Sequence, residues 1–537
     1  MPKENPLPEN GSNKISAYAG RWVARLKDRI VGQGGTPDQA LNAAKSTRHK
    51  ENPQVSFVNT NSPLSFSPLF EQVKDILSSE KSVYLVGGAI RDAVLNIPSH
   101  DLDFALPKGA QKTARKVANA LQASYYSLDD EHEAGRVVVV DEAGLRQIID
   151  FAVFRGEDLE ADLRGRDFTI NAMAVDIQNP QELLDPLGGI SDLFYKQIRP
   201  CSETSFKDDP LRTLRAVRFA AKFKFKILAE SKKGIRDSVS GLENISPERI
   251  RDEVFKILNA PNPGTSLRVM DILGMMPYVF PEVIQLKGVG QSDPPINDLW
   301  EYSLQTVKYL DIILRQLDIH YKHENEDGGN LATGLIAERL GRYRQQITDH
   351  IKKELTTERD YRPLLILAAL YHAVEKIGSK DGLSRDLARE RVKALHLSNA
   401  EIVRFSTILK YQSHSILSEE GNPSRLDIYR FFKETDEAGV SVALLSLGKL
   451  LASFGESVDH KKLEKLLVVL RALLEAYWEN YETDINPPAL FDGKELMEMI
   501  DLPEGPKIGA LIEKIREGQI IGEITSKEDA IKFIQEN

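Results

Sequence analysis

The sequence predicts an α+β fold, with a mixed α/β unit in the N-terminal part and a mostly α-helical remainder. Between residue 69 and about residue 195, apolar runs typical of strands alternate with helical stretches; the runs are Val83–Val86, Asp103–Leu106, Ser124–Leu128, Arg136–Asp141 and Arg146–Phe154. After Lys196 the apolar residues recur almost throughout with the period of amphipathic helices. A chain of 537 residues is longer than one hydrophobic core usually serves, so several domains are expected.

The order of these patterns predicts seven segments. They are a polar, disordered tail (1–15), a small ββα module (16–50), a linker rich in Pro, Ser and Asn (51–68), a mixed α/β head (69–195), a helical neck (196–285), a helical body (286–440) and a helical tail (441–537). In the module, RWVARLKDRIVG predicts two strands around a turn at Lys27-Asp28, and Thr36, Pro37 and Gln39 form a helix-start signal.

Composition and charge exclude several classes of protein. The single cysteine, Cys201, excludes an intramolecular disulfide and a cysteine-rich zinc site. No apolar run reaches the roughly 18 residues of a membrane span, and the N-terminus lacks the apolar region of a secretory signal, so we expect a cytoplasmic protein with no membrane partner. The net charge of −10 argues against non-specific coating of nucleic acid. Residues 196–236 reverse this charge locally, with 12 Lys or Arg against 4 Asp or Glu. Such a basic segment could bind an RNA backbone.

The most informative stretch is VYLVGGAIRDAVLNIPSHDLDFAL, residues 83–106. Asp101 and Asp103 are one residue apart on a predicted strand, so their carboxylates share one face. Two adjacent carboxylates repel unless a cation lies between them, and hard divalent cations take oxygen ligands and accompany substrate phosphates. Gly87 and Gly88 precede a helix, where backbone amides can approach a phosphate closely. The stretch indicates a nucleotide-handling centre; a solvated pair of strand acids is the alternative.

Further motifs follow at short intervals. Asp150 in RQIIDFAVF could be a third carboxylate on the metal face or a surface acid at a strand end. RDFTINA (166–172) is followed by LLDPLGGISDL (183–193), and DDPLR (208–212) leads into a helix on which arginines recur every third residue, at Arg212, Arg215 and Arg218.

GGAIRD, DLD, RDFTINA, DPLGG and DDPLRTLRAVRF, in this order, resemble the tRNA nucleotidyltransferase and bacterial poly(A) polymerase family of the DNA polymerase beta superfamily. The resemblance is to the class II CCA-adding type and covers roughly residues 66–280, with a weaker match in the tail. It implies template-independent addition of C and A, from CTP and ATP, to the 3′ end of the tRNA acceptor arm. It also implies two Mg²⁺ ions and no DNA partner.

The resemblance assigns a role to each motif residue. Asp101 and Asp103 would bind metal with Asp150 as the third catalytic carboxylate; the nucleotide-binding residues would be Gly87, Gly88, Arg91, Arg166, Asp209, Arg212, Arg215 and Arg218. Asp209 and Arg212 would read the base, because a carboxylate accepts from the exocyclic amine that C and A share while a guanidinium donates to a ring nitrogen or carbonyl.

For several motif residues a structural role remains the alternative. Asp167 and Asn171 could support the site without touching substrate. Arg215 and Arg218 could form a solvated helix face, and the basic run after Lys222 is interpreted as surface.

Two departures from the family pattern bear on function. One arginine, Arg166, precedes the DFT where the family usually has two, and only GEDLEADLRG separates it from Arg155. Many CCA-adding relatives have a longer mobile segment here, and a short one resembles enzymes that add only the two C residues. We therefore hypothesise CC addition, with a partner enzyme completing the end.

The second departure concerns residues 296–378, which resemble the HD-type phosphohydrolase domain often fused to this family. Tyr302 stands at the position of a ligand His, and Ala373 stands where an Asp should follow His372. A lone His does not supply a metal site, so a helical scaffold without hydrolase activity is expected.

Poly(A) polymerase is the nearest competing function, because it shares the chemistry and the motifs. Two more distant candidates are a non-catalytic RNA-binding protein and a nucleotide hydrolase. The intact Asp101, Asp103 and Arg212 argue against an RNA-binding protein without catalysis, and the eroded HD pattern argues against a hydrolase.

Overall fold

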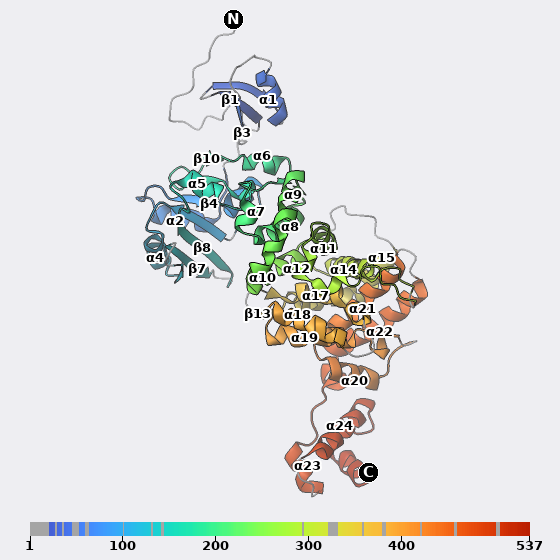
Figure 1. Cartoon of the computed structure of the whole chain (residues 1–537). Coiled ribbons are helices and arrows are strands. Elements are labelled where there is room, and N and C mark those ends of the chain that lie inside the picture. The colour runs from blue at the N-terminus through green and yellow to red at the C-terminus, as the bar shows by residue number, and fades with distance from the viewer. Residues whose placement is uncertain are drawn as a thin grey trace. The chain divides into compact units, whose positions relative to one another are not determined.

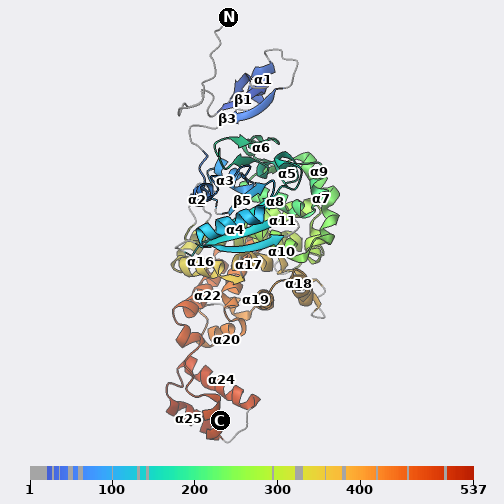
Figure 2. The same ribbon diagram turned by 90° about the vertical axis from the view of Figure 1, so that its left-hand side faces the viewer.

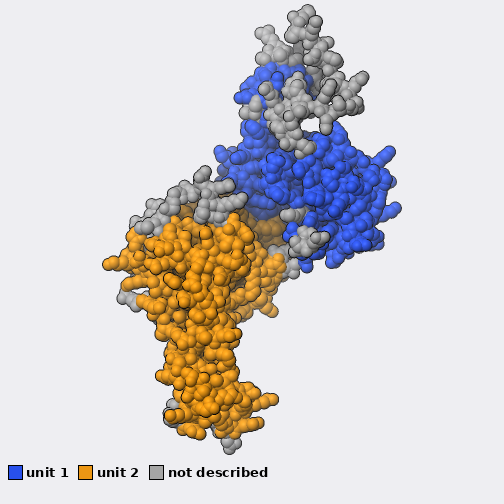
Figure 3. Space-filling model, turned by 180° about the vertical axis from the view of Figure 1, so that it is seen from behind, with its two compact units in different colours: residues 1–238 blue, residues 239–537 orange. Residues whose placement is uncertain are grey.

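The computed structural model divides the chain into two compact units, residues 1–238 and 239–537, which are coloured separately in Figure 3. The structure describes residues 21–26, 29–34, 37–45, 53–58, 64–99, 101–129, 133–140, 144–292, 295–320, 331–356, 359–377, 383–418, 421–455, 459–500 and 505–536. The predicted tail at 1–15 and the predicted helix cap at Thr36 lie outside these residues. Each unit is described in turn.

The N-terminal module has three strands and one helix. Strands β1 (Arg21–Leu26), β2 (Arg29–Gly34) and β3 (Gln54–Val58) form an antiparallel sheet in the order β2-β1-β3, with helix α1 (Pro37–Lys45) against it. The prediction that 51–68 is only a linker was wrong, because Gln54–Val58 pairs with β1 as a third strand. A Cβ on Gly32 would lie 2.4 Å from the carbonyl oxygen of Ala40, and a Cβ on Gly34 would lie 2.7 Å from the Ala40 amide nitrogen, so both glycines allow close packing of strand and helix.

The head is built on a seven-stranded mixed sheet (Figure 1). Its order is β10-β9-β4-β5-β8-β7-β6, and β5·β8 is the parallel pair among otherwise antiparallel neighbours. The strands are β4 (Tyr84–Val86), β5 (Asp101–Leu106), β6 (Ser124–Asp129), β7 (Ala134–Val140), β8 (Arg146–Val153), β9 (Ala174–Asp176) and β10 (Leu183–Leu184). All five strand-like runs predicted from the sequence therefore form strands of one sheet.

One face of this sheet carries the aromatic core of the head. Phe104 of β5 stacks on Phe151 of β8 with ring centroids 5.0 Å apart, and Phe70 of α2 (Pro68–Ile76) lies 6.4 Å from Phe104. Helix α4 (Ala110–Leu121) packs on β7 and β8, and Figure 2 shows it lying across the strands. Since side chains alternate along a strand, this core directs Asp101 and Asp103 to the opposite face.

Short helices complete the unit. Helix α3 (Gly88–Val94) follows β4 directly and packs against β4 and β5. The others are α5 (Leu159–Arg164), the 3₁₀ turn η1 (Thr169–Asn171), α6 (Gly189–Phe194), α7 (Ser205–Asp208), α8 (Leu211–Phe223) and α9 (Ala229–Ser238), with strands β11 (Gln197–Ile198) and β12 (Lys226–Ile227) between them.

The second unit is almost entirely helical, as the sequence predicts. Its helices are α10 (Pro247–Asn259), α11 (Pro263–Ile272), α12 (Met276–Val279), α13 (Pro281–Ile284), α14 (Leu299–Gln316), α15 (Leu331–Leu340), α16 (Arg344–Lys352), α17 (Tyr361–Tyr371), α18 (Leu383–Ala394), α19 (Asn399–Tyr411), α20 (Arg425–Thr435), α21 (Ala438–Phe454), α22 (His460–Trp478), α23 (Gly493–Ile500), α24 (Pro506–Ile521) and α25 (Lys527–Glu536). A two-strand ribbon joins β13 (Glu354–Thr356) to β14 (Arg359–Asp360).

Helix α14 organises the body. It packs against α11, α17 and α21. Gly448 of α21 lies so close to α14 that a Cβ there would be 3.2 Å from the Leu310 side chain. The predicted boundary between body and tail at 440/441 was wrong, because it falls inside α21, which belongs to this core. The terminal helices α23–α25 instead have a core of their own, built on Phe491, Leu496, Ile515, Ile524 and Ala530.

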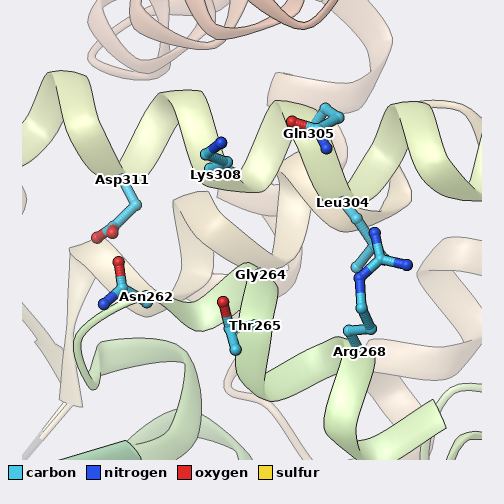
Figure 4. Close-up of a pocket in the computed structure, with 8 residues that line it drawn as sticks. All are labelled: Asn262, Gly264, Thr265, Arg268, Leu304, Gln305, Lys308 and Asp311. Carbon is cyan, nitrogen blue, oxygen red and sulfur yellow. The ribbon is translucent and has the colours of Figure 1, made fainter. Parts of the chain in front are cut away.

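A small cavity of about 130 Å³ lies between α11 and α14 (Figure 4). Two of the charged residues that line it are held in ion pairs: Arg268 donates to Glu301 at 2.7 Å, and Asp311 pairs with Arg315 at 3.1 Å. The Arg268–Glu301 pair fixes α11 against α14, whereas the Asp311–Arg315 pair lies within α14. The cavity is thus a packing gap lined by side chains with structural roles.

Among the residues that the structure describes, no single helix is long and apolar enough to span a membrane. One bent pair, α20 with α21, meets the criteria of length and composition together, with an angle of 104° between the helices.

The second unit contains a buried histidine that links its stability to pH. His350 of α16 is 6% exposed, shares a hydrogen bond of 2.9 Å between Nε2 and the Ser441 hydroxyl, and stacks edge-on against Tyr361. Burial lowers the pKa of His350 to about 4, although Glu437 acts in the opposite direction. Between about pH 6.5 and pH 4, His350 is therefore protonated in the unfolded chain but remains neutral in the folded chain.

We expect this histidine to destabilise the fold as pH falls. Below its unfolded pKa of about 6.5 the stabilising free energy decreases, and by pH 4 about 3 kcal/mol is lost. His350→Gln should remove that part of the pH dependence, measured as urea-unfolding midpoints of wild type and variant from pH 7 to pH 4. Exposed His460 gives the control variant His460→Gln. Identical pH profiles for wild type and His350→Gln would contradict the burial argument.

Candidate active site

The carboxylates singled out in the sequence lie in one row across the sheet. In the register of β4, β5, β8 and β7, Val86 is opposite Asp103, Asp103 is opposite Asp150, and Asp150 is opposite Arg136. Asp101 lies two residues before Asp103 on the same face of β5, exposed at the start of the strand. The fold therefore brings Asp101, Asp103 and Asp150 together, and it adds Arg136, which has no counterpart among the residues predicted from sequence.

The pKa of Asp103 is shifted by its surroundings. Burial raises its pKa to about 6, with Asp150 and Asp101 acting in the same direction and Arg166 and Arg136 opposing them. A buried carboxylate among like charges is stabilised by any cation that reaches it. Asp101 and Asp103 offer hard oxygen ligands to one side of the sheet, so this pair fits Mg²⁺.

Asp150 lies beside Asp103, as predicted, and is paired with an arginine. Arg136 binds it with two parallel hydrogen bonds, Nε to Oδ1 and Nη2 to Oδ2, both at 2.8 Å. Both carboxylate oxygens are thus engaged by a guanidinium. No group of three His, Cys, Asp or Glu side chains within the described ranges is arranged to hold a metal. A bound ion would therefore take two protein carboxylates and complete its shell with phosphate oxygens and water.

The turn before α3 brings the predicted phosphate site to these acids. Gly87 has a φ of +79°, a left-handed conformation that favours glycine. A Cβ at this position would lie 3.2 Å from Nη1 of Arg166 and 3.4 Å from Oδ2 of Asp103. Gly87 is therefore required both by its backbone conformation and by the close approach of these two side chains.

Arg91, one turn into α3, is 5% exposed and firmly held. Its Nε donates to Asp92 at 2.7 Å, and its Nη1 donates to Asn171 at 2.5 Å. Asn171 in turn donates to Asp167 at 3.0 Å. The GGAIRD and RDFTINA motifs are thus joined by side-chain hydrogen bonds, an arrangement in which Asn171 positions Arg91.

Asp167 joins the same network to helix α8. Although burial raises its pKa, Arg215 together with hydrogen bonds from Asn171 and the Phe168 amide holds the pKa of Asp167 below its usual value. Arg215 donates to Asp167 through Nε at 2.9 Å and Nη2 at 2.5 Å. Arg215 thus forms a structural ion pair, which favours a structural role over the predicted nucleotide contact.

Arg212 anchors the start of α8 to the loop before η1. It donates to the carbonyl oxygen of Gly165 at 2.7 Å, to that of Arg166 at 3.2 Å and to the Ser205 hydroxyl at 2.8 Å. Asp209 accepts from the Leu211 amide at 3.2 Å, which orients its carboxylate at the helix start. The predicted base-reading pair, Asp209 and Arg212, therefore lies beside Arg166.

The short segment between Arg155 and Arg166 is a braced helix. Asp158 caps α5 by accepting from the Ala161 amide at 2.8 Å. Asp162, which is 2% exposed, accepts from the Arg155 amide at 3.1 Å and from Nη2 of Arg166 at 3.0 Å. One buried carboxylate thus ties together both ends of the segment, and it also orients Arg166. No local sequence pattern marks Asp162 as a site residue, because its partners are defined only by the fold.

The DPLGG motif is structural in this chain. Asp185 accepts from the backbone amides of Gly189 at 2.7 Å and Ile190 at 3.0 Å, so it caps α6. A Cβ on Gly189 would lie 2.3 Å from the Thr169 carbonyl oxygen, which explains the glycine by close packing of α6 on η1.

The region compared with HD phosphohydrolases has the features of a packed core. His372 is fully buried, its Nδ1 lies 2.7 Å from the Ala369 carbonyl oxygen, and its ring stacks edge-on against Tyr302 at 4.8 Å. Burial and the nearby ammonium of Lys449 hold the pKa of His372 well below its usual value. The aromatic ring and the ammonium occupy the surroundings of His372, which supports the expected scaffold role.

Comparison with known proteins agrees with this geometry. Residues 83–199 match the family model of the poly(A) polymerase head domain, and residues 224–286 match that of the probable RNA- and SrmB-binding site of polymerase A. The chain is 29% identical to a CC-adding tRNA nucleotidyltransferase of Geobacter sulfurreducens, over 84% of this chain and 91% of that protein. It is 27% identical to an A-adding tRNA nucleotidyltransferase of Deinococcus radiodurans, over 84% and 94%.

Solved structures show the same fold. A Thermotoga maritima CCA-adding enzyme complexed with tRNA matches with a TM-score of 0.52 and 22% identity, over 87% of this chain and 94% of that one. A CCA-adding enzyme in complex with ATP matches with a TM-score of 0.56 and 22% identity, over 87% and 92%.

These matches, taken with the carboxylate row and the Gly87 turn, define the protein as a nucleotidyltransferase. Its head and the following segment match the tRNA nucleotidyltransferase and poly(A) polymerase family, in agreement with the order of its sequence motifs.

The packed surroundings of His372 give a test of the scaffold interpretation. We expect no metal-dependent phosphatase or phosphodiesterase activity, and we expect EDTA to leave the melting temperature of the protein unchanged, because the described residues of the helical body contain no group of three His, Cys, Asp or Glu side chains that could hold a metal. The measurements are phosphate release from nucleoside monophosphates and 2′,3′-cyclic nucleotides with added divalent metals, and a thermal melt with and without chelator. Hydrolysis that persists in Asp101→Ala would contradict this interpretation.

Proposed function

We propose that the protein adds nucleotides from CTP and ATP to the 3′ end of tRNA without a template. The single observation that carries the proposal is the placement of Asp101 and Asp103 on one face, beside Arg166 and the Gly87 turn. The named relatives act as CC-adding and A-adding tRNA nucleotidyltransferases, which supports tRNA as the acceptor.

In the proposed reaction the 3′ hydroxyl of the RNA attacks the α-phosphorus of the incoming nucleotide. A new phosphodiester bond forms as the bond to the β-phosphate oxygen breaks, and pyrophosphate leaves. Asp101 and Asp103 would hold two Mg²⁺ ions, which when bound would activate the hydroxyl and stabilise the leaving group. Asp150, held by Arg136, would contribute negative charge beside Asp103.

The remaining residues of the site would bind and orient the nucleotide. Gly88 and Arg91 would receive the triphosphate at the start of α3, and Arg166 would hold the sugar or a phosphate. Arg166 is suited to this because Asp162 fixes its guanidinium while Nη1 faces the Gly87 turn. Arg218, whose guanidinium lies over the Phe219 ring at 4.3 Å, stays a proposed phosphate contact.

Asp209 and Arg212 would select the base. A carboxylate accepts from the amine that C and A share, whereas G and U present the opposite pattern at that edge. The anchoring of Arg212 to the carbonyl oxygens of Gly165 and Arg166 supports a fixed reading edge, which removes the need for a template strand.

We further propose that addition stops after the two C residues. The support is the braced segment between Arg155 and Arg166, in which Asp162 ties the two ends together and leaves little freedom to reshape the base site. Poly(A) polymerase is the second candidate, because the matching head-domain family model carries that description.

A nucleotide-resolved extension assay tests the acceptor and the stopping point. The substrates are tRNA ending before CCA, after CC and after CCA, each with CTP and ATP together. We expect two C residues to be added to the first substrate and none to the others. Efficient terminal A addition would contradict the CC-only proposal alone, and a long A tail would support poly(A) polymerase instead.

Removal of one metal-facing carboxylate tests the chemistry. Asp103→Asn keeps the size of the side chain but removes its charge, so incorporation should fall on the order of 10³-fold while tRNA binding stays unchanged, measured by gel shift. Asp237→Asn, an exposed position on α9, is the matched control. Undiminished incorporation by Asp103→Asn would show that this strand does not carry the reaction.

A further inference from the structure

The second half of α8 carries a pair of stacked aromatic rings. Phe219 and Phe223 lie one helical turn apart, with ring centroids 6.0 Å apart and planes inclined by 12°. Phe219 is 4% exposed, and Phe223 is partly exposed beside it. We refer to these two rings as the Phe219–Phe223 platform.

Cations from two different helices gather on this platform. The guanidinium carbon of Arg91, from α3, lies 4.6 Å from the centroid of Phe223 and 5.5 Å from that of Phe219. Arg218 lies 4.3 Å from the Phe219 centroid, and the Lys222 ammonium lies 5.3 Å from the Phe223 centroid. Cation–π contact holds each charge in place without neutralising it.

Lys222 differs from Arg91 in its hydrogen-bond and ion-pair partners. Arg91 is bonded to Asp92, whereas the Lys222 ammonium makes no hydrogen bond or ion pair to any residue in the described ranges. Partial burial, followed by the positive charges of Arg91 and Arg218, lowers the pKa of Lys222, although Asp92 and Asp101 act in the opposite direction. Such a gathering of cations is stabilised by an anion that reaches all of them.

The position of Lys222 along α8 indicates which anion this is. The helix starts at Leu211, beside the proposed base-reading pair, and Lys222 follows Arg212 after about 15 Å of helix. At that end lies Arg91, which comes from the turn that approaches Asp103, and the charge of Asp101 also reaches Lys222. A nucleotide held by its base near Arg212 would extend its phosphates toward this end of the helix.

We propose that Lys222 binds the terminal phosphates of the incoming nucleoside triphosphate, and the pyrophosphate after transfer, together with Arg91 and Arg218. The proposal rests on the proposed nucleotide-transfer function and extends its site beyond the sequence motifs. The Phe219–Phe223 platform would position the three cations. Lys222 directly precedes the basic run that is predicted from the sequence to be surface, and its position beside α3 depends on the packing of α8.

Binding without metal separates this role from catalysis. Affinities for CTP, CDP and CMP are measured in EDTA by isothermal titration calorimetry, for wild type, Lys222→Met and Lys222→Arg. We expect Lys222→Met to weaken CTP binding about 10-fold, because one charge-assisted contact is lost, and to leave CMP binding unchanged. Lys222→Arg should restore CTP binding to within about threefold. Lys233→Met, which removes an exposed lysine of α9, is the matched control.

Steady-state kinetics provide the second readout. In Lys222→Met, both the inhibition constant for pyrophosphate and the KM for CTP should increase. The KM for tRNA should stay at the wild-type value. Its melting temperature should also match wild type, since Lys222 makes no hydrogen bond within the described ranges that the substitution removes.

Three results would overturn the proposal. The first is an equal loss of CMP and CTP affinity in Lys222→Met. The second is a rise confined to the KM for tRNA, which would assign Lys222 to the RNA backbone. The third is the absence of CTP binding by wild type. If wild type binds CTP but adds no nucleotide to any RNA, the proposed function fails while the binding series still decides the role of Lys222.

Discussion

The repulsion between carboxylates on two adjacent strands is the constraint around which the head is organised. Parallel pairing of β5 with β8 places Asp103 beside Asp150, and Asp101 lies on the same face. Burial of like charges is unfavourable unless each is compensated. Arg136 neutralises the charge of Asp150, and Arg166 opposes the rise in the pKa of Asp103. The carboxylates of Asp101 and Asp103 remain directed toward the site. The surplus negative charge suits a divalent cation, which is how the fold prepares a site for nucleotide chemistry.

A second level of organisation comes from helix α8. Arg212 fixes its start to the loop that carries Arg166, and Arg215 fixes its middle to Asp167. From Asp167 the hydrogen bonds continue through Asn171 to Arg91. Arg166 and Arg91, the two arginines nearest the Gly87 turn, are therefore positioned by buried side chains that need not touch substrate. The middle arginine of α8, Arg215, thus serves packing, whereas recognition is the role proposed for Arg212 and Arg218 toward the ends.

The local patterns of the sequence predicted most of the fold, because strands, caps and helix faces depend on near neighbours. The alternation in DLDFAL predicted the face shared by Asp101 and Asp103, and the glycine pair predicted the tight turn at Gly87. What the sequence did not reveal depends on pairing across long separations. Arg136 meets Asp150 only through strand register, and β3 lies within a stretch that has the composition of a linker. The body–tail boundary was misplaced because nothing local in α21 indicates that it packs on α14.

The central claim is that the face of Asp101 and Asp103 holds metal and phosphate while the start of α8 reads the base. A crystal structure with Mn²⁺ and a CTP analogue that cannot be cleaved between its α- and β-phosphates tests this most directly. The account predicts anomalous peaks within bonding distance of both carboxylates and the cytosine edge within hydrogen-bond distance of Asp209 and Arg212. Metal bound away from β5, or a base bound away from α8, would contradict it.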